Sequence, residues 1–583
     1  MTGIRVWAPN ARRVRILTGG QESEMAKLDG GWWSAETPIP ADADYAFRLD
    51  DDRTPLPDPR SPWQPYGVDG PSRRVDHAAF RWSDGEWQAP PFSSAVIYEL
   101  HIGTFTPEGT FDSAIHRLAH LSSLGVTHVE LMPVPEFSGD WGWGYDGVDL
   151  YAPHHAYGGP LGLKRFVDAC HSRGIAVLLD VVYNHLGPAG NYLSRFGPYF
   201  TKKYLTPWGE AMNLDGAGSR QVRRFLCDNA LMWLRDYHID GLRLDAIHAI
   251  YDSSAVHFLE QLAQEVEELE TQTGRRLVLV AESDLNDPRV VTPIEEGGYG
   301  IDAQWNDDFH HALHTALTGE CTGYYRDFAG LRDLAKSLQS AFVYDGHYSD
   351  FRGRHHGRKP HGIAGTRFVG FLQNHDQAGN RARGERTGHY MNLSQLQIGA
   401  ALVLCSPFVP LLFQGEEFGA STPFCYFTQH ADPELARAVT EGRRAEFAAL
   451  GWNTGEIPDP QDPDTFLRSK LDWNEPACEP HKSLLEWHRN LISLRKEIPA
   501  LRDGRLEDVG VQFDDEKRWL VVKRGPVAIA CNLAESKQSI PLPFEGVVLL
   551  ASKEGGSRGS AVDLPGESVM IVADAQNTER INR

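Results

Sequence analysis

The sequence predicts an α/β fold, a (β/α)₈ TIM barrel flanked by an N-terminal and a C-terminal β-sandwich, on three observations. Between residues 95 and 415, eight short apolar runs alternate with helical patterns and loops. On either side of the barrel, short alternating runs are separated by Pro, Gly and Asp turns. At 583 residues, the chain is also too long for one ordinary domain. We therefore expect domains at 1–90, 91–500 and 501–583.

The elements of the predicted barrel are read from the spacing of apolar residues. The expected strands are 95–103, 127–134, 175–182, 241–247, 277–282, 301–306, 367–374 and 409–415. Helical stripes are predicted at 162–173, 219–237 and 252–271, and Ser219 is expected to cap the second of these. A last stripe, formed by Trp487, Leu491, Leu494 and Ile498, would close the barrel.

Composition limits the possible partners and the compartment. The formal net charge is −22, which argues against a nucleic-acid or anionic-membrane partner and suits a neutral substrate. Seven scattered cysteines without a CxxC pair predict reduced thiols. No signal-peptide pattern is found, and the longest apolar run, 400–413, is broken by Ser406 and two prolines. These features predict a cytoplasmic protein.

Charged and polar residues gather at the ends of four predicted strands. They lie in the motifs DVVYNH (180–185), GLRLDAIH (241–248), VAES (280–283) and LQNHD (372–376). Any one of them could be structural, and Arg243 with Asp245 alone could be an ion pair. The carboxyl ends of barrel strands form one face, however, so four such ends favour an active site. The sequence carries no Walker loop, dinucleotide fingerprint, zinc-ligand spacing or nucleophile elbow.

These residues match the chemistry of a retaining glycoside hydrolase. That mechanism needs an ionised carboxylate as nucleophile and a protonated carboxyl as acid, about 5–5.5 Å apart. Arg243 shares a strand face with Asp245 and would keep that group ionised. Glu282 follows the apolar run LVLVA, where burial would raise its pKa.

The four motifs, in this order, resemble those of the α-amylase superfamily of retaining glycoside hydrolases. The resemblance implies that Asp245 is the nucleophile, Glu282 the general acid/base and Asp376 the stabiliser of the transition state. It also implies that His185, Arg243 and His375 bind the sugar in subsite −1 and that Tyr145 stacks on its ring; Asp180 and His248 are further candidates for substrate binding.

Longer loop stretches resemble the maltooligosyltrehalose trehalohydrolases within this superfamily. They are residues 143–160, 180–193, 206–216, 370–386 and 411–419. The resemblance implies hydrolysis of the α-1,4 bond next to the terminal trehalose unit of maltooligosyltrehalose, a place in trehalose biosynthesis, and maltooligosyltrehalose synthase as pathway partner. The first alternative is a glucan branching or debranching enzyme, which shares the domain layout. The second is a non-catalytic glucan-binding barrel, although all three acids are present.

Selectivity for trehalose requires polar groups on the leaving-group side of the cleft. We expect the loop after the seventh strand to supply Asn380, Arg381 and Glu385, and the loop after the eighth to supply Glu416. The alternative is that these charges form only a solvated loop. Trp208 and Trp305, together with Trp141 and Trp143, are candidates for stacking on glucose rings or for packing within the loops.

No metal or cofactor is predicted. The calcium site of ordinary amylases depends on a long insertion after the third strand, and here the insertion, 186–218, is short. Asn184 could bind a metal, but we expect it to make a hydrogen bond within its loop.

Overall fold

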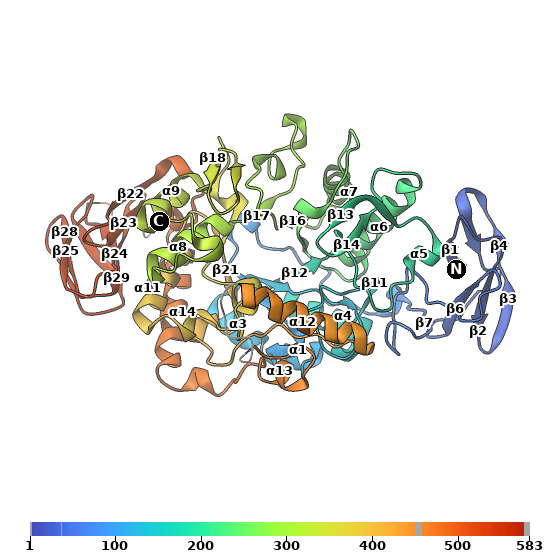
Figure 1. The fold of residues 1–583 in the computed structure, drawn as a ribbon. Helices are drawn as coiled ribbons and strands as arrows, with labels where there is room; N and C mark the ends of the chain where they lie inside the picture. The colour runs from blue at the N-terminus through green and yellow to red at the C-terminus, as the bar shows by residue number, and fades with distance from the viewer. Residues whose placement is uncertain (1–2, 37, 450–456, 577–583) are drawn as a thin grey trace.

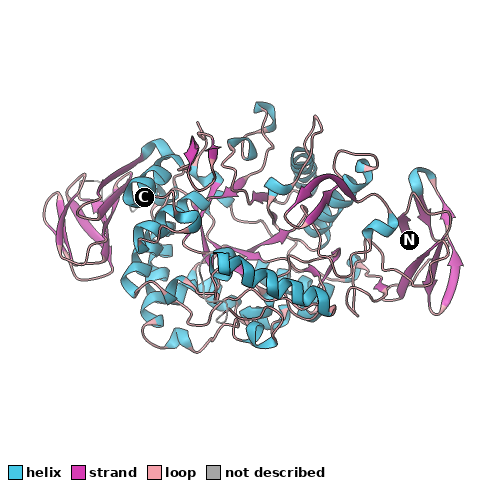
Figure 2. Ribbon diagram, in the orientation of Figure 1, coloured by secondary structure: helices cyan, strands magenta, loops and turns pink. Residues whose placement is uncertain are grey.

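The computed structural model describes residues 3–36, 38–449 and 457–576. A central barrel lies between an N-terminal and a C-terminal β region, so that the molecule is elongated (Figures 1 and 2). The predicted fold class is confirmed. The limits drawn at residues 90 and 500 stay predictions, and the outermost residues of both terminal domains, 1–2 and 577–583, lie outside the described residues.

The barrel is a closed parallel sheet, and all eight predicted strands are found in it. Its strands, in spatial order, are β12 (Ala176–Val181), β15 (Gly241–Leu244), β16 (Val278–Ala281), β17 (Ala303–Trp305), β20 (Phe368–Phe371), β21 (Val409–Phe413), β8 (Ile97–Leu100) and β9 (His128–Leu131). They are shorter than predicted, and Asp245 and Glu282 directly follow β15 and β16. In β15, Leu242 and Leu244 face the surrounding helices, whereas Arg243 points into the barrel.

Helices surround the barrel, and the longer ones, such as α4, α6 and α7, bury an apolar face against it. The α-helices of the chain are α1 (Ile102–Phe105), α2 (Phe111–Ile115), α3 (Leu118–Leu124), α4 (Gly159–His171), α5 (Leu193–Phe196), α6 (Ser219–Asp236), α7 (Phe258–Thr273), α8 (Asp307–Thr318), α9 (Gly330–Ser340), α10 (His375–Gly379), α11 (Leu393–Leu404), α12 (Pro433–Ala449), α13 (Pro463–Leu467), α14 (His481–Glu497) and α15 (Pro499–Arg502). Val222, Leu226 and Trp233 form the buried stripe of α6.

The predicted N-cap of α6 is wrong. Ser219 is the first helical residue, and the cap position is Gly218, at a φ of 84° and without a side-chain cap. Glycine adopts this left-handed conformation without the strain that a side chain causes, and here the turn geometry replaces the hydroxyl cap. The predicted last stripe is mostly found in α14, where Trp487 and Leu491 are buried.

The N-terminal region consists of two antiparallel sheets that share a core with the barrel. One sheet contains β1 (Arg5–Trp7), β5 (Trp32–Ser34) and β4 (Ala26–Lys27), and the other β3 (Gln21–Glu24), β2 (Val14–Thr18), β6 (Asp44–Leu49) and β7 (Ser72–Arg73). The linker that follows is held to the barrel, since Trp82 stacks on His238 and Trp87 on His171, while the Asp84 carboxylate accepts hydrogen bonds from both histidines.

The C-terminal region is a β-sandwich. Its larger sheet contains β22 (Val509–Asp514), β23 (Trp519–Arg524), β24 (Val527–Asn532), β29 (Ser568–Asp574) and β26 (Gly546–Ala551), and its smaller sheet β25 (Gln538–Pro541), β28 (Ala561–Leu564) and β27 (Gly556–Ser557). Ile540 and Val562 of the smaller sheet pack against Ala530 and Met570 of the larger one, so a separate core forms between them.

Three hairpins and helix α12 extend the loops that follow the barrel strands. The hairpins pair β10 (Pro135–Glu136) with β11 (Asp149–Pro153), β13 (Phe200–Thr206) with β14 (Gly209–Met212), and β18 (Asp345–Ser349) with β19 (Arg354–Gly357). The first two hairpins and α12 supply walls of the site described below. Among the described residues, no helix has both the length and the apolar character needed to cross a membrane.

Candidate active site

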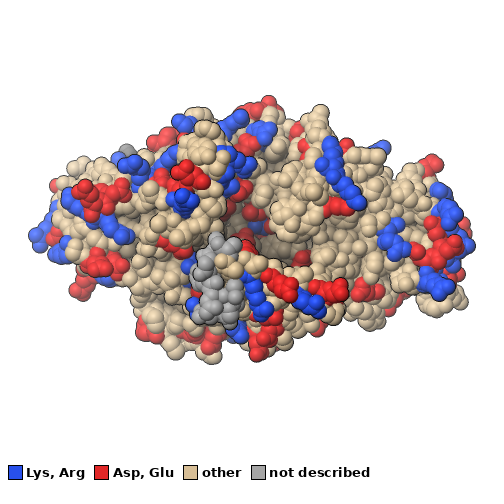
Figure 3. All heavy atoms as spheres, viewed as in Figure 1, with Lys and Arg blue, Asp and Glu red and all other residues tan. Residues whose placement is uncertain are grey.

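A cleft of about 510 Å³ lies at the carboxyl ends of the barrel strands. Figure 3 shows this face of the molecule hollowed next to helix α12. The lining residues come from loops after most of the strands and include Tyr145, His185, Trp208, Asp245, His248, Glu282, His375, Asp376 and Asn380. The three predicted acids and six of the predicted binding residues thus meet in one place.

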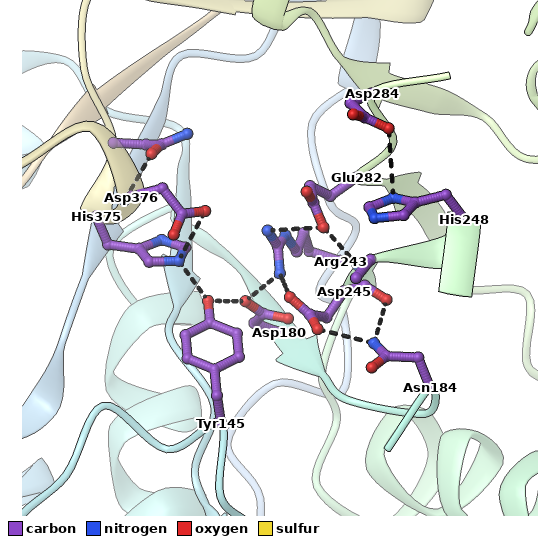
Figure 4. A network of polar contacts seen from close by, with 12 residues as sticks. Tyr145, Asp180, Asn184, Arg243, Asp245, His248, Glu282, Asp284, His375 and Asp376 are labelled. Carbon is purple, nitrogen blue, oxygen red and sulfur yellow. Dashed lines mark hydrogen bonds and ion pairs between the residues drawn. The ribbon is translucent and has the colours of Figure 1, made fainter. Parts of the chain in front are cut away.

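Arg243 organises the centre of this cleft (Figure 4). Its Nη1 donates to Asp180 Oδ2 at 2.8 Å and to Asp245 Oδ1 at 2.7 Å, and its Nη2 lies 3.6 Å from Glu282 Oε2. The ring of Trp305 covers the other side of the guanidinium, at 4.3 Å. One fully buried cation therefore contacts three carboxyl groups.

Asp245 follows β15 directly and is held as a carboxylate. Asn184 Nδ2 donates to Asp245 Oδ2 at 2.8 Å, so this hydrogen bond reaches the end of the neighbouring strand and not only the loop of Asn184. Burial opposes ionisation, but the charges of Arg243 and His185 outweigh it and lower the pKa of Asp245. A carboxylate is the form that a nucleophile requires.

Glu282 follows β16, and its pKa is shifted in the opposite direction to that of Asp245. Burial, reinforced by the negative charges of Asp245 and Asp376, raises its pKa above the usual value. Ala246, at a left-handed φ of 40°, turns the chain sharply after Asp245 and donates its N–H to Glu282 Oε2. The neighbouring carboxyls thus have opposite pKa shifts, as an acid and a nucleophile require.

The third acid lies across the cleft, in α10. His375 joins it to the barrel, since Nδ1 is 2.5 Å from Glu99 Oε1 and Nε2 is 3.4 Å from Asp376 Oδ2. Burial lowers the pKa of His375, but Asp376 and Glu99 outweigh this effect and raise it to about 9. The Tyr145 ring lies on the His375 ring, with centroids 5.1 Å apart, and its hydroxyl donates to Asp180 Oδ2 at 2.6 Å.

Two side walls bound the cleft. On one, the His185 and Trp208 rings are stacked with centroids 4.4 Å apart, and Trp208 is 50% exposed. A further hollow of about 620 Å³ opens beyond these two residues. On the other wall, beside Glu282, His248 Nδ1 lies 3.9 Å from Asp284 Oδ1, and Arg352 Nη1 donates to Asp284 Oδ2 at 2.8 Å.

Several predicted binding residues do not line the cleft. Trp305 is 2% exposed and lies inside the barrel beneath Arg243. Arg381 Nη1 donates to Glu320 at 3.2 Å and its guanidinium stacks on Tyr390. Glu385 accepts from the Arg383 N–H, and the buried Glu416 accepts from the Phe413 N–H.

The two tryptophans of the Tyr145 loop also pack against protein. Trp143 stacks on Phe424 and donates to the Cys425 carbonyl, and Trp141 stacks on Phe466. These contacts attach the loop to the segment after the eighth strand. Of the four tryptophans considered, Trp143 and Trp208 are among the cleft-lining residues, and only Trp208 is exposed.

Other residues of the site were not predicted. Glu99 supports His375, Asp284 lies two positions after Glu282, and Arg443 and Glu446 line the cleft from α12. Glu99 could have been found, because it is a charged residue in the short apolar run that predicts β8. Nothing in the sequence points to Arg443, because α12 reaches the cleft through tertiary packing.

One group outside the cleft has donors of the kind that bind metals. Ligand atoms of Glu136, His154 and His155 lie within 4.8 Å of one another. Hydrogen bonds already use these atoms: His155 Nδ1 donates to Glu136 at 2.6 Å, and His154 Nε2 lies 3.1 Å from the Gly139 carbonyl. Because His154 Nδ1 accepts from the Ala156 N–H, its Nε2 carries a proton and cannot bind a metal.

Comparisons with known proteins agree with this geometry. The family model described as "Alpha amylase, catalytic domain" matches residues 76–204, and a model of a domain of unknown function matches residues 504–571. Malto-oligosyltrehalose trehalohydrolase from Rhizobium sp. is 49% identical over 98% of this chain and 97% of that protein. Malto-oligosyltrehalose trehalohydrolase from Mycobacterium tuberculosis is also 49% identical, over 99% of this chain and 100% of that protein.

The chain belongs to the malto-oligosyltrehalose trehalohydrolase family. A solved structure of an α-amylase-like protein from Salmonella typhimurium has a TM-score of 0.90 and 40% identity, covering 98% of this chain and 97% of that one. The 1,4-alpha-glucan branching enzyme of Pseudoalteromonas atlantica is more distant, at 31% identity over 54% of this chain and 49% of that protein. Family membership therefore favours the trehalohydrolase interpretation over the branching alternative.

Proposed function

We propose that the chain hydrolyses the α-1,4-glucosidic bond next to the terminal trehalose unit of maltooligosyltrehalose and releases trehalose and a maltooligosaccharide. The observation that carries the proposal is the placement of Asp245 and Glu282 around one buried arginine, with pKa values shifted in opposite directions. Such a pair, with Asp376 opposite, is suited to retaining glycoside hydrolysis.

The reaction proceeds by two displacements. Asp245 attacks the anomeric carbon of the sugar in subsite −1 while Glu282 gives its proton to the glycosidic oxygen, so the trehalose unit leaves as an alcohol. Glu282, now ionised, takes a proton from water, and the resulting hydroxide attacks the same carbon and releases Asp245. The proton taken from water restores Glu282 to its starting state.

The remaining residues hold the sugar and its developing positive charge. Asp376 lies close to the reacting ring and stabilises the oxocarbenium-like transition state. His185 and His375 bind hydroxyls in subsite −1, and Tyr145 offers its ring to the sugar. Asp180 holds Arg243 and Tyr145 in place, since both donate to its Oδ2.

The position of Glu282 sets the orientation of the substrate. The group that accepts its proton leaves on its side of the cleft, where His248 and Asp284 also lie. We infer that the trehalose unit binds here, and that the maltooligosaccharide extends toward Trp208 and the hollow beyond it. Of the predicted trehalose-side residues, only Asn380 lines the cleft.

A competition experiment tests the specific reaction. Maltotriosyltrehalose and maltopentaose have the same ring count, and we expect kcat/KM for the first to be larger by up to about 10⁴-fold, since polar sites reject ligands that leave their groups unpaired. Equal kcat/KM values would contradict the proposal. Formation of 1,6 branch points would favour the branching alternative.

The same reaction also indicates which kind of reaction supplies the substrate. A substrate that ends in a trehalose unit must come from a reaction that isomerises the reducing end of a maltooligosaccharide, which is the step expected of maltooligosyltrehalose synthase. The seven cysteines are free thiols, consistent with the predicted cytoplasmic location.

A further inference from the structure

Arg443 brings a cation from α12 into the wall of the cleft. Its side chain is only 10% exposed, and its guanidinium lies 5.1 Å from the ring of Tyr426 and 4.7 Å from the ring of Phe447. The two rings restrict where the guanidinium can lie, and its N–H groups point to the end of α10. No role in the reaction follows from these packing contacts alone.

The polar contacts of Arg443 lead to the third acid. Its Nη2 donates to the Gly379 carbonyl, and its Nη1 donates to Asn380 Oδ1 at 3.3 Å. Asn380 Nδ2 in turn donates to Asp376 Oδ1 at 3.0 Å. A chain of hydrogen bonds therefore runs from α12 through one amide to a catalytic carboxylate.

The chemistry of the Asn380 amide fixes which group donates in each of these hydrogen bonds. An asparagine side chain has an acceptor end and a donor end, and a guanidinium can only donate. Arg443 therefore selects the orientation that turns the Asn380 oxygen toward α12 and the Asn380 NH₂ toward Asp376. The Asp376 carboxylate, which can only accept, favours the same orientation, so the loss of Arg443 removes one of the two contacts that hold the Asn380 amide in place.

We propose that Arg443 is a positioning residue for Asp376 and acts through the amide of Asn380. The proposal rests on the function given to Asp376 above, and in it Arg443 acts on Asp376 through Asn380 and not by a direct hydrogen bond. The alternative is that Arg443 only attaches α12 to the barrel through Gly379, Tyr426 and Phe447.

A double-mutant cycle separates these two roles. We expect Arg443→Met to lower kcat by roughly 10- to 100-fold with little change in KM, because a displacement of about 1 Å at a reacting group can have such an effect. If Arg443 acts through the amide, Arg443→Met combined with Asn380→Ala should be no slower than Asn380→Ala alone. Effects that multiply in the double variant would overturn the proposal.

Matched controls keep the result interpretable. Arg444, the next residue on α12, is exposed, so Arg444→Met should leave both kcat and KM unchanged. Arg443→Lys keeps a donor, so it should restore part of kcat; no restoration would contradict the proposal. If Arg443→Met lowers the folded fraction seen by circular dichroism, the same cycle is run with Arg443→Lys.

The proposed function has its own test. Asp376→Asn should abolish activity whether or not Arg443 acts on it. Substantial activity in Asp376→Asn would count against the function given to Asp376, whereas multiplying effects in the cycle would count against Arg443 alone.

Discussion

At the scale of single residues, the site is governed by one buried positive charge. Arg243 contacts Asp180, Asp245 and Glu282, and a single guanidinium cannot compensate three buried carboxylates. Burial raises the pKa of Asp180 to about 7 and also raises that of Glu282, whereas the pKa of Asp245 is lowered. The same type of side chain thus has a lowered pKa at Asp245 and a raised pKa at Glu282, as the proposed nucleophile and acid require.

This arrangement predicts the effect of neutralising each acid. Asp245→Asn and Glu282→Gln should each lower kcat by several orders of magnitude, roughly 10³-fold or more, because each removes a group that acts in the transition state. Steady-state kinetics on maltotriosyltrehalose measure this. Circular dichroism should show an unchanged fold, and turnover close to that of the unmodified enzyme in Asp245→Asn would rule out the assignment.

The two pKa shifts also predict the pH dependence of kcat/KM. Asp245 must be ionised, so activity should fall as the pH drops through its lowered pKa. Glu282 must be protonated, so activity should fall again as the pH rises through its raised pKa. In Glu282→Gln, assayed with a substrate whose leaving group needs no proton, the alkaline fall should be lost. If it persists, another group gives rise to it.

At the scale of elements, the loop that carries Tyr145 and helix α10 hold each other in place. An added Cβ on Gly379, the last residue of α10, would lie 2.0 Å from Cζ2 of Trp143. The Trp143 ring is buried against Phe424, so it cannot move freely. The absence of a side chain at Gly379 is therefore a condition for the approach of the two elements.

Gly379→Ala should displace this contact and lower kcat/KM, and overpacking of this kind also lowers the free energy of unfolding by about 1–3 kcal/mol. Kinetics and chemical denaturation measure the two effects. The matched control is Gly442→Ala on α12, where an added Cβ meets nothing within 4 Å. That change should be neutral or stabilise the helix by about 0.5–1 kcal/mol. Equal behaviour of the two variants would contradict the packing argument.

The strands and loops also show which parts of the structure could be predicted from the sequence. All eight barrel strands were predicted, because apolar runs with charged ends are local features, and the three acids were placed by motifs at those ends. The sequence was a poorer guide on the longer loops. Arg381 and Glu416 were predicted to face the trehalose unit, but both make contacts outside the cleft lining. The conformation of a long loop depends on its contacts with other loops, and the spacing of apolar residues along the sequence carries no information about those contacts.

At the scale of the whole molecule, the barrel supplies the chemistry and the additions to it shape the cleft. The three acids lie at or shortly after the ends of barrel strands, whereas the loop between β10 and β11, the turn of hairpin β13–β14 and helix α12 supply walls of the cleft. Selectivity for trehalose is therefore expected from the additions, and retention of configuration from the barrel.

One measurement tests both expectations together. Proton NMR of maltotriosyltrehalose during the first turnovers follows the free trehalose and the anomeric configuration of the new reducing end. The account predicts that trehalose and maltotriose appear in equal amounts and that maltotriose is released first as the α-anomer. Initial release of the β-anomer would contradict the double displacement at Asp245, and cleavage that leaves trehalose attached to glucose would contradict the proposed binding of the trehalose unit beside Glu282.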